Sequence, residues 1–292
     1  GIRDDLVTGV QTCALPISEI VHFMDLMNNA GNPAPVDVDL DGDVAVLQYT
    51  GGTTGRSKGA MLTQGNLSAN VSQMLLWYVD LKPGDEKILG ILPFFHVFAM
   101  TAVMNFAVAS GAQMILLPRY ELGQTLKTIT KKKPTIFPAV PTIYASINQS
   151  PDLSKHDLSS IRFCISGGAP LPLEVKESFE RLTSCRLVEG YGLSETAPVA
   201  TCNAMRDVNK PGSIGQVMPQ TQISIRGLEA PHELMPVGER GEVWIKGPQV
   251  MAGYLNRPDE NATHLRDGWF RTGDVGYMDD EGHFFLVDRV KD

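Results

Sequence analysis

The chain has 292 residues, of which 25 are Lys or Arg and 33 are Asp or Glu, so its formal net charge is −8. Apolar residues make up 43% of the chain, which is an ordinary globular composition with enough material for one large domain or two smaller ones. The acidic balance argues against a nucleic-acid partner, because backbone binding requires Lys and Arg to neutralise phosphates. The one basic run, Lys131–Lys133, is interpreted as a solvated helix end. No C-x-x-C pair occurs, which argues against structural zinc or a disulfide framework and fits a reducing, cytoplasmic compartment; the four cysteines are Cys13, Cys164, Cys185 and Cys202.

The two ends of the sequence predict a piece of a longer protein. Residues 1–18 show neither a signal-peptide pattern nor a helix or strand period, and we interpret them as non-native cloning or adapter sequence. Residues 19–29 have apolar positions at helical spacing after Ser18, which predicts a helix. The chain stops at Asp292, directly after a strand-like run.

An acidic segment at residues 37–43 imitates the start of a calcium-binding EF-hand loop. The twelfth position of that loop is Gln48 rather than Glu, and a strand-like run, Val44–Tyr49, occupies the rest of it. We therefore reject calcium and interpret the segment as a surface loop before a strand.

The stretch from Ile88 to Pro118 carries no charged residue and is long enough to cross a bilayer. Polar and helix-breaking residues interrupt it, and its apolar pieces change period. It predicts a buried β-loop-α-β unit with parallel strands, made of strand 88–92, loop 93–97, helix 98–109 and strand 113–117. A membrane span remains the alternative.

Strand-like and helix-like runs alternate through the next part of the chain, which predicts an α/β fold with a mostly parallel sheet. The expected strands are 135–137, 161–166 and 186–189, and the expected helices are 142–148 and 173–182. After about residue 211, Gly and Pro become more frequent. Short strands at 222–226, 242–246, 269–272 and 283–287 then predict a small β-rich subdomain.

A loop rich in glycine and hydroxyl side chains follows the predicted strand that starts at Val44. Its glycines, Gly51, Gly52 and Gly55, allow backbone N–H groups to approach an anion. Hydroxyl donors and one positive charge come from Thr50, Thr53, Thr54, Ser57 and Lys58. The loop suits a polyphosphate, although the Walker A pattern fits it in no register. The alternative is a hairpin turn.

Three further segments place polar or small residues after predicted strands, where ligands bind in open α/β sheets. In residues 189–196, Glu195 is a candidate Mg²⁺ ligand or, alternatively, part of a helix-capping Ser-Glu pair. In residues 269–274, Asp274 is a candidate acceptor for both ribose hydroxyls or, alternatively, a turn residue. Residues 166–170 leave room for a flat base, or form a plain strand-to-helix turn.

In this order and spacing, the motifs resemble those of the adenylate-forming superfamily of acyl-CoA synthetases, nonribosomal-peptide adenylation domains and luciferases. The segments that carry the resemblance are Tyr49–Gly59, Gly190–Thr196, Gly238–Glu242 with Gly253–Tyr254, Thr272–Asp274 and Asp288–Arg289. Mild departures are Gly51 in place of a common Ser and Ser57 in place of the usual Pro. Residues 47–52, 93–98 and 246–251 are most similar to bacterial long-chain fatty-acid–CoA ligases.

The resemblance implies the α/β large domain of this superfamily, with its parallel-sheet layers and a small β-rich subdomain, incomplete at both ends. The implied parts are a partial core at 19–211, the subdomain at 212–287 and the start of a hinge at 288–292, with Lys291 at the hinge position. The C-terminal domain, with its catalytic lysine and one wall of the CoA channel, would lie beyond the last residue. We therefore expect the chain alone to be inactive in acyl-CoA synthesis.

The resemblance also implies a reaction, in which a long-chain fatty acid is activated by ATP as acyl-adenylate with release of pyrophosphate and is then transferred to CoA. Mg²⁺ is the implied metal. Alternatives are an aryl-CoA ligase, a fatty-acyl-AMP ligase and a nucleotide-binding module without catalysis. The implied location is the cytoplasm; association with the inner membrane through the lipid substrate, and oligomerisation, are left open.

Carried over residue by residue, the resemblance implies a binding site. Residues Thr50 to Lys58 would hold the β- and γ-phosphates, Ser194 the α-phosphate and Glu195 the Mg²⁺. The adenine would lie against Gly168, Ala169, Gly190 and Tyr191, with Gly192 in the same motif, and the ribose would contact Asp274 and Arg289. His96 would lie beside the acyl carboxylate, its alternative being a core histidine. The implied catalytic set is His96, Lys58, Ser194 and Glu195.

Overall fold

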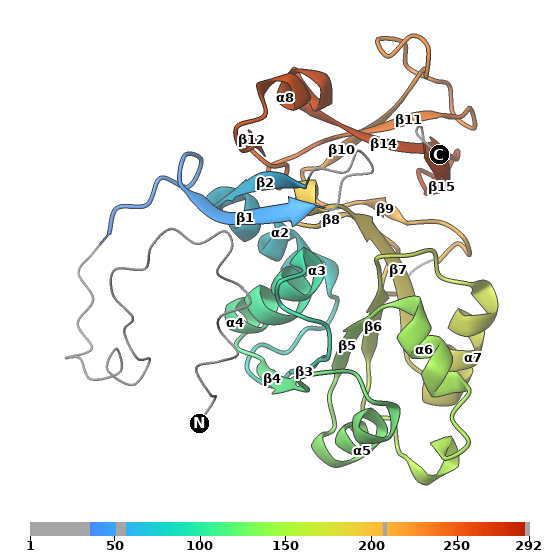
Figure 1. The fold of residues 1–292 in the computed structure, drawn as a ribbon. Helices are drawn as coiled ribbons and strands as arrows, with labels where there is room; N and C mark the ends of the chain where they lie inside the picture. Colours follow the sequence, from blue (N-terminus) through green and yellow to red (C-terminus); the bar gives the residue numbers. More distant parts are fainter. Residues whose placement is uncertain (1–35, 51–56, 207–208, 290–292) are drawn as a thin grey trace. The chain divides into compact units, whose positions relative to one another are not determined.

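The computed structural model describes residues 36–50, 57–206 and 209–289 (Figure 1). The chain divides into two units, residues 1–38 and 39–292, and all elements given below belong to the second. Several sequence predictions lie outside the described residues: those for 1–18 and the helix at 19–29, Gly51–Gly55, and Lys291.

The largest sheet has seven strands in the order β4-β3-β5-β6-β7-β8-β9. Pairing is parallel from β4 to β7 and antiparallel from β7 to β9. The strands are β3 Lys87–Gly90, β4 Gln113–Leu116, β5 Ile136–Ala139, β6 Phe163–Ser166, β7 Arg186–Gly192, β8 Val199–Cys202 and β9 Gln216–Val217. The predicted α/β class with a mostly parallel sheet is confirmed.

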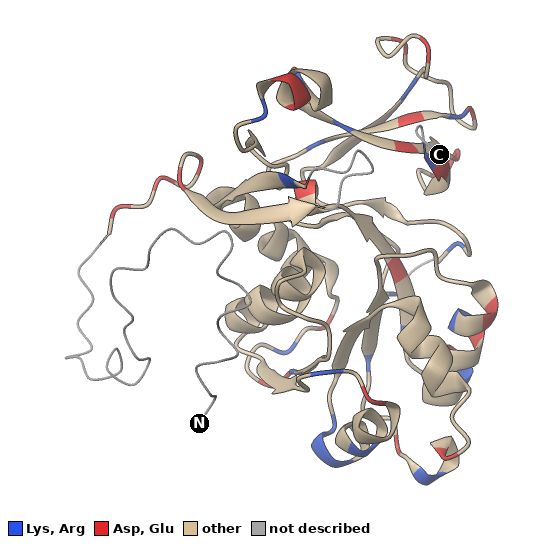
Figure 2. Ribbon diagram, viewed as in Figure 1, with Lys and Arg blue, Asp and Glu red and all other residues tan. Residues whose placement is uncertain are grey.

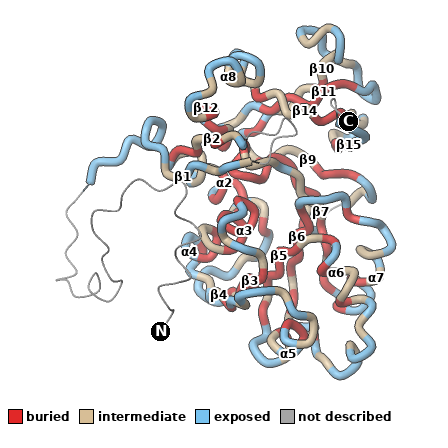
Figure 3. The backbone as a smooth tube through the Cα atoms, viewed as in Figure 1, coloured by how far each residue is buried: buried red, intermediate tan, exposed pale blue. Residues whose placement is uncertain are grey.

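Helices pack on both faces of this sheet, so its strands are apolar on both sides (Figure 3). Phe137, Cys164 and Leu187 face the layer of α5 Leu122–Lys132, α6 Pro141–Asn148 and α7 Leu173–Thr183. Their neighbours Ile136, Phe163 and Val188 face the layer of α2 Gln64–Trp77 and the helical run α3 Val97–Ala99, η3 Met100–Asn105 and α4 Phe106–Ser110. Successive strand residues therefore point to opposite faces of the sheet, and each face has its own hydrophobic core.

The predicted β-loop-α-β unit is confirmed, with differences in its helix. The run from Val97 to Ser110 is continuous, but its middle six residues form a π-helix. It ends at Gly111, whose φ of 67° lies in the left-handed region that glycine adopts without strain. Within the described residues, no helix is both long and apolar enough to cross a membrane.

The sequence analysis missed helix α2, and two buried polar residues explain why. Asn70 hydrogen-bonds the Val199 backbone through its Nδ2 at 2.7 Å, and Gln73 donates to the Pro219 carbonyl at 2.7 Å. Both side chains occupy the buried face, which weakens the apolar period on which recognition of a helix depends. Thr63 and Asn66 form a capping box at its start.

Two antiparallel sheets complete the fold. One has the strands β10 Gln222–Arg226, β11 Gly241–Lys246, β13 Leu265–Arg266, β14 Trp269–Met278 and β15 Phe284–Arg289. The other has β1 Val44–Thr50, β2 Lys58–Thr63 and β12 Gly253–Tyr254, and α8 Pro258–His264 follows it in the chain. The predicted β-rich character after residue 211 is confirmed, although β14 is six residues longer than the predicted strand 269–272, and β9 and β12 join other sheets.

Figure 2 shows charged residues in loops and at helix ends, and also along several strands. Lys131 and Lys132 are exposed in the last turn of α5, and Lys133 follows with an ion pair to Asp157. The interpretation of this run as a solvated helix end is confirmed. The acidic segment before β1 is an exposed turn, in which the Asp43 carboxylate accepts the Asp39 N–H at 2.9 Å, as the loop interpretation predicts.

Candidate nucleotide and acyl site

Strand β7 carries the second predicted motif, and it changes neighbours at Glu189. Up to that residue it pairs in parallel with β6, and from Gly190 it pairs antiparallel with β8. The prediction that the strand ends at Glu189 was therefore wrong, because Gly190, Tyr191 and Gly192 continue it. Tyr191 is consequently held by strand pairing rather than by a loop.

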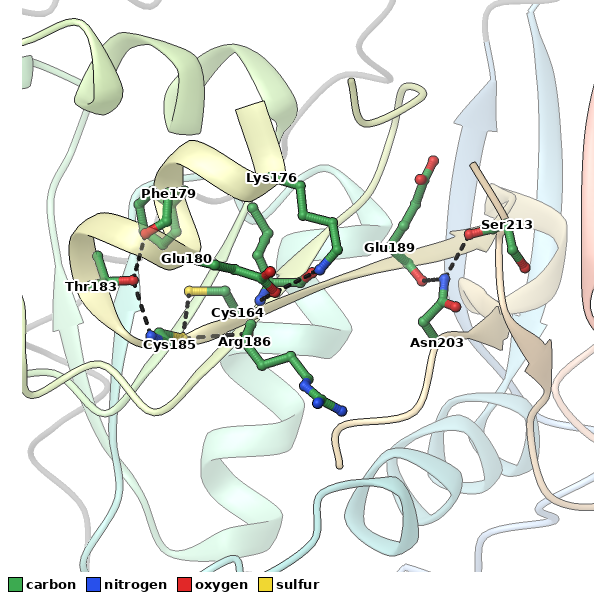
Figure 4. Close-up of polar contacts among 11 residues, drawn as sticks. Cys164, Lys176, Phe179, Glu180, Thr183, Cys185, Arg186, Glu189, Asn203 and Ser213 are labelled. Carbon is green, nitrogen blue, oxygen red and sulfur yellow. Dashed lines mark hydrogen bonds and ion pairs between the residues drawn. The ribbon is translucent and has the colours of Figure 1, made fainter. Parts of the chain in front are cut away.

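Side chains complete the hydrogen bonding of β7 where a strand neighbour is missing (Figure 4). Glu180 on α7 accepts the Leu187 N–H at 2.8 Å, and Lys176 donates to the Leu187 carbonyl at 2.7 Å. The carbonyl of Glu189 accepts the backbone N–H of Asn203 at 2.9 Å and its Nδ2 at 3.3 Å. Helix α7 and the end of β8 therefore fix the strand just before the motif begins.

A cavity of about 370 Å³ lies where β7, β14 and β15 meet the turn after β6. Of the residues predicted to bind nucleotide, it brings together Gly168, Ala169, Gly190, Tyr191, Gly192, Asp274 and Arg289. The turn after β6 depends on Gly168, whose φ of 81° disfavours residues with a Cβ. The cavity combines small residues, one aromatic ring and a charged pair.

The charged pair of this cavity is Asp274 with Arg289, which lie opposite each other on β14 and β15. Asp274 is only 3% exposed; Arg289 Nε lies 2.9 Å from one carboxylate oxygen, and the Tyr191 hydroxyl donates to the other at 2.6 Å. Burial, and then the negative charge of Asp274, raise the pKa of Tyr191, so its hydroxyl stays a donor.

Asp274 lies within a strand and is not a turn residue, which rules out the alternative interpretation. Gly273 has a φ of 75°, and the pairing of β11 with β14 shifts register there, because Glu242 faces Val275 while Trp244 faces Arg271. Such a bulge lets one strand continue while it redirects a side chain. The bulge therefore gives β14 its length and places Asp274 at the cavity.

A second cavity, of about 200 Å³, shares Gly168, Gly190, Tyr191 and Gly192 with the first. Its other lining residues include His96, Ser194 and the apolar Val97, Phe98, Ile165 and Val199. Two chambers thus meet around Tyr191: charged side chains are among those that line the first, whereas His96, Ser194 and apolar side chains line the second.

His96 is exposed at the second cavity and is therefore not a core histidine. Its Nδ1 accepts the Phe98 N–H at 3.2 Å and caps the helix that starts at Val97. A neutral imidazole that accepts at Nδ1 carries its proton on Nε2. His96 can therefore offer an N–H donor to a carboxylate.

Ser194 and Glu195 follow β7 in a short 3-10 turn, η5 Ser194–Thr196. Glu195 is 8% exposed, and its Oε1 accepts the Tyr254 hydroxyl at 2.7 Å. Burial raises the pKa of Tyr254, which keeps that hydroxyl a donor. Within the described ranges no group of three or more metal-binding side chains occurs, but a lone carboxylate fits Mg²⁺, which also takes nucleotide phosphates and waters.

The described ends of the predicted phosphate loop lie in an antiparallel hairpin, in which Thr50 of β1 faces Lys58 of β2. Lys58 Nζ lies 3.0 Å from Glu260 on α8 and 4.8 Å from the centre of the Tyr254 ring. Ser57 is exposed. Lys58 is thus close to Tyr254, the residue that also contacts Glu195.

Comparison with known proteins identifies the chain. The family model described as "AMP-binding enzyme" matches residues 7–255. The chain belongs to this AMP-binding enzyme family. Its mixed α/β fold matches that of ATP-bound MatB from Rhodopseudomonas palustris, with a TM-score of 0.83 and 32% identity over 89% of this chain and 51% of the other.

Curated relatives of this chain include CoA ligases. A long-chain-fatty-acid–CoA ligase from Bacillus subtilis is 54% identical over 255 residues, which are 87% of this chain and 45% of the relative. A 4-coumarate–CoA ligase from Pinus taeda is 38% identical over 86% of this chain and 48% of the relative. The chain therefore spans about half the length of the curated relatives it matches.

Three residues of the candidate site were not assigned a role from the sequence. Tyr254 was noted only as part of a motif, Glu189 only as the start of another, and Glu260 not at all. Tyr254 lies 59 positions from Glu195, and Glu260 lies 202 positions from Lys58, so no local spacing could reveal these contacts. The one signal in the sequence for Glu189 was its position directly before Gly-Tyr-Gly, at the end of the predicted strand.

Glu189 lines the first cavity, and burial raises the pKa of its carboxyl from the ordinary 4.5 to about 7. The Leu171 N–H, which Glu189 accepts at 3.2 Å, and the charge of Lys176 offset part of this rise. Between pH 4.5 and 7 the folded state binds more protons at Glu189 than the unfolded state. The free energy of unfolding therefore falls as the pH rises through this range. Above pH 7 Glu189 is ionised in the folded state, and the full free-energy cost of burying its charge is present.

We expect Glu189→Gln to raise the free energy of unfolding at pH 8 by up to roughly 3 kcal/mol, because it removes a buried charge and keeps the oxygen that accepts the Leu171 N–H. At pH 5 the gain should be much smaller. Urea unfolding at both pH values measures it, with the exposed Glu174→Gln as control. Equal gains at both pH values would show that ionisation of Glu189 carries no cost.

Proposed function

We propose that the protein containing this chain is an ATP-dependent acyl-CoA ligase that acts on a long-chain fatty acid. In the first step the acid's carboxylate attacks the α-phosphate of ATP, which forms acyl-adenylate and releases pyrophosphate. In the second, the thiolate of CoA attacks the acyl carbon and releases AMP. The proposed domain division is a partial core at 19–211 and a β-rich subdomain at 212–287, in a cytoplasmic protein.

The observation that carries the proposal is the meeting of two cavities at Tyr191. The Asp274–Arg289 pair suits a ribose, because a carboxylate can accept both of its hydroxyls. The small residues Gly168 and Ala169 suit a flat base opposite the Tyr191 ring. The second cavity, with the apolar side chains of Val97, Phe98, Ile165 and Val199 in its wall, then lies where an acyl chain would leave the reacting carboxylate.

The reacting groups would lie between these cavities. We propose that Ser194 donates to the α-phosphate, and that the His96 Nε2–H holds the acid's carboxylate for in-line attack. Lys58, with Thr50 to Ser57, would hold the β- and γ-phosphates, and Glu195 would hold Mg²⁺, which when bound neutralises phosphate charge. Each residue acts by orientation and charge, the main means available in phosphoryl-type transfer.

The acid is assigned as a long-chain fatty acid because the Bacillus subtilis relative is 54% identical. An aromatic acid is the second candidate, since the Pinus taeda 4-coumarate–CoA ligase is 38% identical over nearly the same length. Both candidates share the nucleotide half of the site and differ in what occupies the second cavity.

ATP–pyrophosphate exchange by the full-length gene product tests the proposal. We expect palmitate to support exchange, and 4-coumarate to support at least tenfold less. Faster exchange with 4-coumarate would replace the substrate assignment. No exchange with either acid, from a protein that binds ATP in calorimetry, would favour a nucleotide-binding module without catalysis.

A further inference from the structure

Tyr254 contacts two residues that come from distant parts of the chain and that carry opposite charges. Its hydroxyl donates to Glu195 Oε1 at 2.7 Å, and the Lys58 ammonium lies 4.8 Å from the centre of its ring. The side chain is almost fully buried, with 2% of the residue exposed. It therefore connects the predicted metal ligand to the predicted phosphate-binding lysine.

The backbone of Tyr254 is itself held on both sides. Its N–H donates to Asn261 Oδ1 at 2.7 Å, and Asn261 Nδ2 donates back to its carbonyl at 3.1 Å. Strand β12 also pairs Tyr254 with Ala60 of β2, two residues after Lys58. Helix α8 and strand β2 therefore fix where the tyrosine ring lies before any ligand binds.

Glu195 is held by the same short segment of chain in two ways. The Met251 N–H donates to the Glu195 backbone carbonyl at 2.9 Å, and the Tyr254 hydroxyl holds one oxygen of its carboxylate. Among the described residues, no hydrogen bond to the other carboxylate oxygen is found. A carboxylate with one oxygen fixed presents the second in a defined direction, which is how hydrogen-bonded partners orient metal ligands.

We infer that Tyr254 is a positioning residue of the site, which orients Glu195 toward Mg²⁺ and holds Lys58 beside the nucleotide phosphates. The inference rests on the proposed function, because it assumes that magnesium and ATP occupy this site. Tyr254 touches neither substrate nor metal and acts only through its two neighbours. Its hydroxyl hydrogen-bonds the Glu195 carboxylate, and its ring contacts the Lys58 ammonium. Substitutions that remove the hydroxyl alone or the whole ring can therefore separate the two roles.

Calorimetric binding of ATP to the full-length gene product, at a series of Mg²⁺ concentrations and without Mg²⁺, tests the hydroxyl. Tyr254→Phe removes the hydroxyl and keeps the ring. We expect it to raise the Mg²⁺ concentration needed for half of the full ATP affinity by about ten- to a hundredfold, the usual effect of losing a partner of a metal ligand. ATP binding without Mg²⁺ should be unchanged, because Lys58 keeps its place over the ring.

The ring is tested by Tyr254→Leu in the same experiment. It removes the aromatic face beneath Lys58, a contact whose loss should weaken metal-free ATP binding by a further about two- to fivefold. The two variants should therefore differ without Mg²⁺ and share the same defect in Mg²⁺ dependence. Identical metal-free binding in both would overturn the role of the ring.

Two controls separate positioning from a general structural effect. Tyr78 is another buried tyrosine, and its hydroxyl has no hydrogen-bond partner among the described residues, so Tyr78→Phe should leave the Mg²⁺ dependence unchanged. In a double-mutant cycle, Tyr254→Phe should add nothing to the Mg²⁺ defect of Glu195→Gln, because it acts through that carboxylate. Additive defects would overturn the inference.

Failure of the inference differs from failure of the proposed function. If the unmodified full-length gene product binds ATP more tightly with Mg²⁺ and Tyr254→Phe does the same at the same Mg²⁺ concentrations, only the positioning role is overturned. If the unmodified full-length gene product shows no ATP binding at any Mg²⁺ concentration, the nucleotide site of the proposed function is contradicted, and the inference with it.

Discussion

Replacement of Lys58 by Ala should slow ATP–pyrophosphate exchange in the full-length gene product by about ten- to a hundredfold. The reason is the loss of a charge-assisted contact to the β- and γ-phosphates, worth roughly 1.5–3 kcal/mol. Lys58 lies at the start of β2, and its side chain is 12% exposed, so the ammonium is positioned before nucleotide binds. Exchange rates at saturating palmitate and at ATP concentrations below KM measure the effect, because they report the loss of an ATP contact.

The ion pair between Lys58 and Glu260 complicates a single substitution, because Lys58→Ala also removes a partner of Glu260. Glu260→Gln breaks the same ion pair and leaves the ammonium in place. Since partly exposed ion pairs contribute about 0–1 kcal/mol, we expect that variant to stay within about fivefold of the unmodified rate. Lys246→Ala, in the β-rich sheet, controls for the loss of a lysine.

If Lys58→Ala and Glu260→Gln slowed exchange equally, the ion pair rather than the phosphate contact would explain the loss. Lys58 would then be a structural residue of the β2–α8 contact, and the assignment of Thr50–Lys58 to the phosphates would fail.

The order of strands and helices was predictable because it depends on local patterns. Apolar runs on β3, β5 and β6 are what a strand buried on both faces requires, and the alternation with helices predicted a parallel sheet. The motif residues Gly168, Tyr191 and Asp274 line one cavity, where β14 of the antiparallel sheet meets β7 and the turn after β6. Their role in nucleotide binding stays a prediction.

Features that depend on partners distant in sequence were not predictable. Strand β7 continues past Glu189 because it pairs with β8 from Gly190 onward. The sequence of residues 186–192 does not indicate this pairing. The alternative that Asp274 is a turn residue was wrong, because the pairing with β11 shifts register near Gly273 and β14 continues through this bulge. Helix α2 was missed for the same kind of reason. A polar residue, Asn70, lies on its buried face, and its hydrogen-bond partner there, Val199, is 129 positions away in the sequence.

Asp274→Asn tests the ribose contact, and its effect should fall on ATP alone. The substitution keeps the shape of the side chain but removes the charge opposite Arg289 and replaces one accepting oxygen by an NH₂ group. We expect the apparent KM for ATP to rise about ten- to a hundredfold, from the loss of roughly 1.5–3 kcal/mol. The KM for the fatty acid should stay within about twofold, because the contact belongs to the nucleotide.

Stability and binding must be separated here, because Asp274 is buried and also accepts the Tyr191 hydroxyl. Asp279→Asn is the matched control: Asp279 is ion-paired with Lys210 at 2.6 Å, follows β14 directly and is not among the residues that line either cavity. It should lower the melting temperature and leave both KM values unchanged. A rise in both KM values for Asp274→Asn, in step with its loss of stability, would mean that Asp274 holds β14 and β15 together and does not bind ribose.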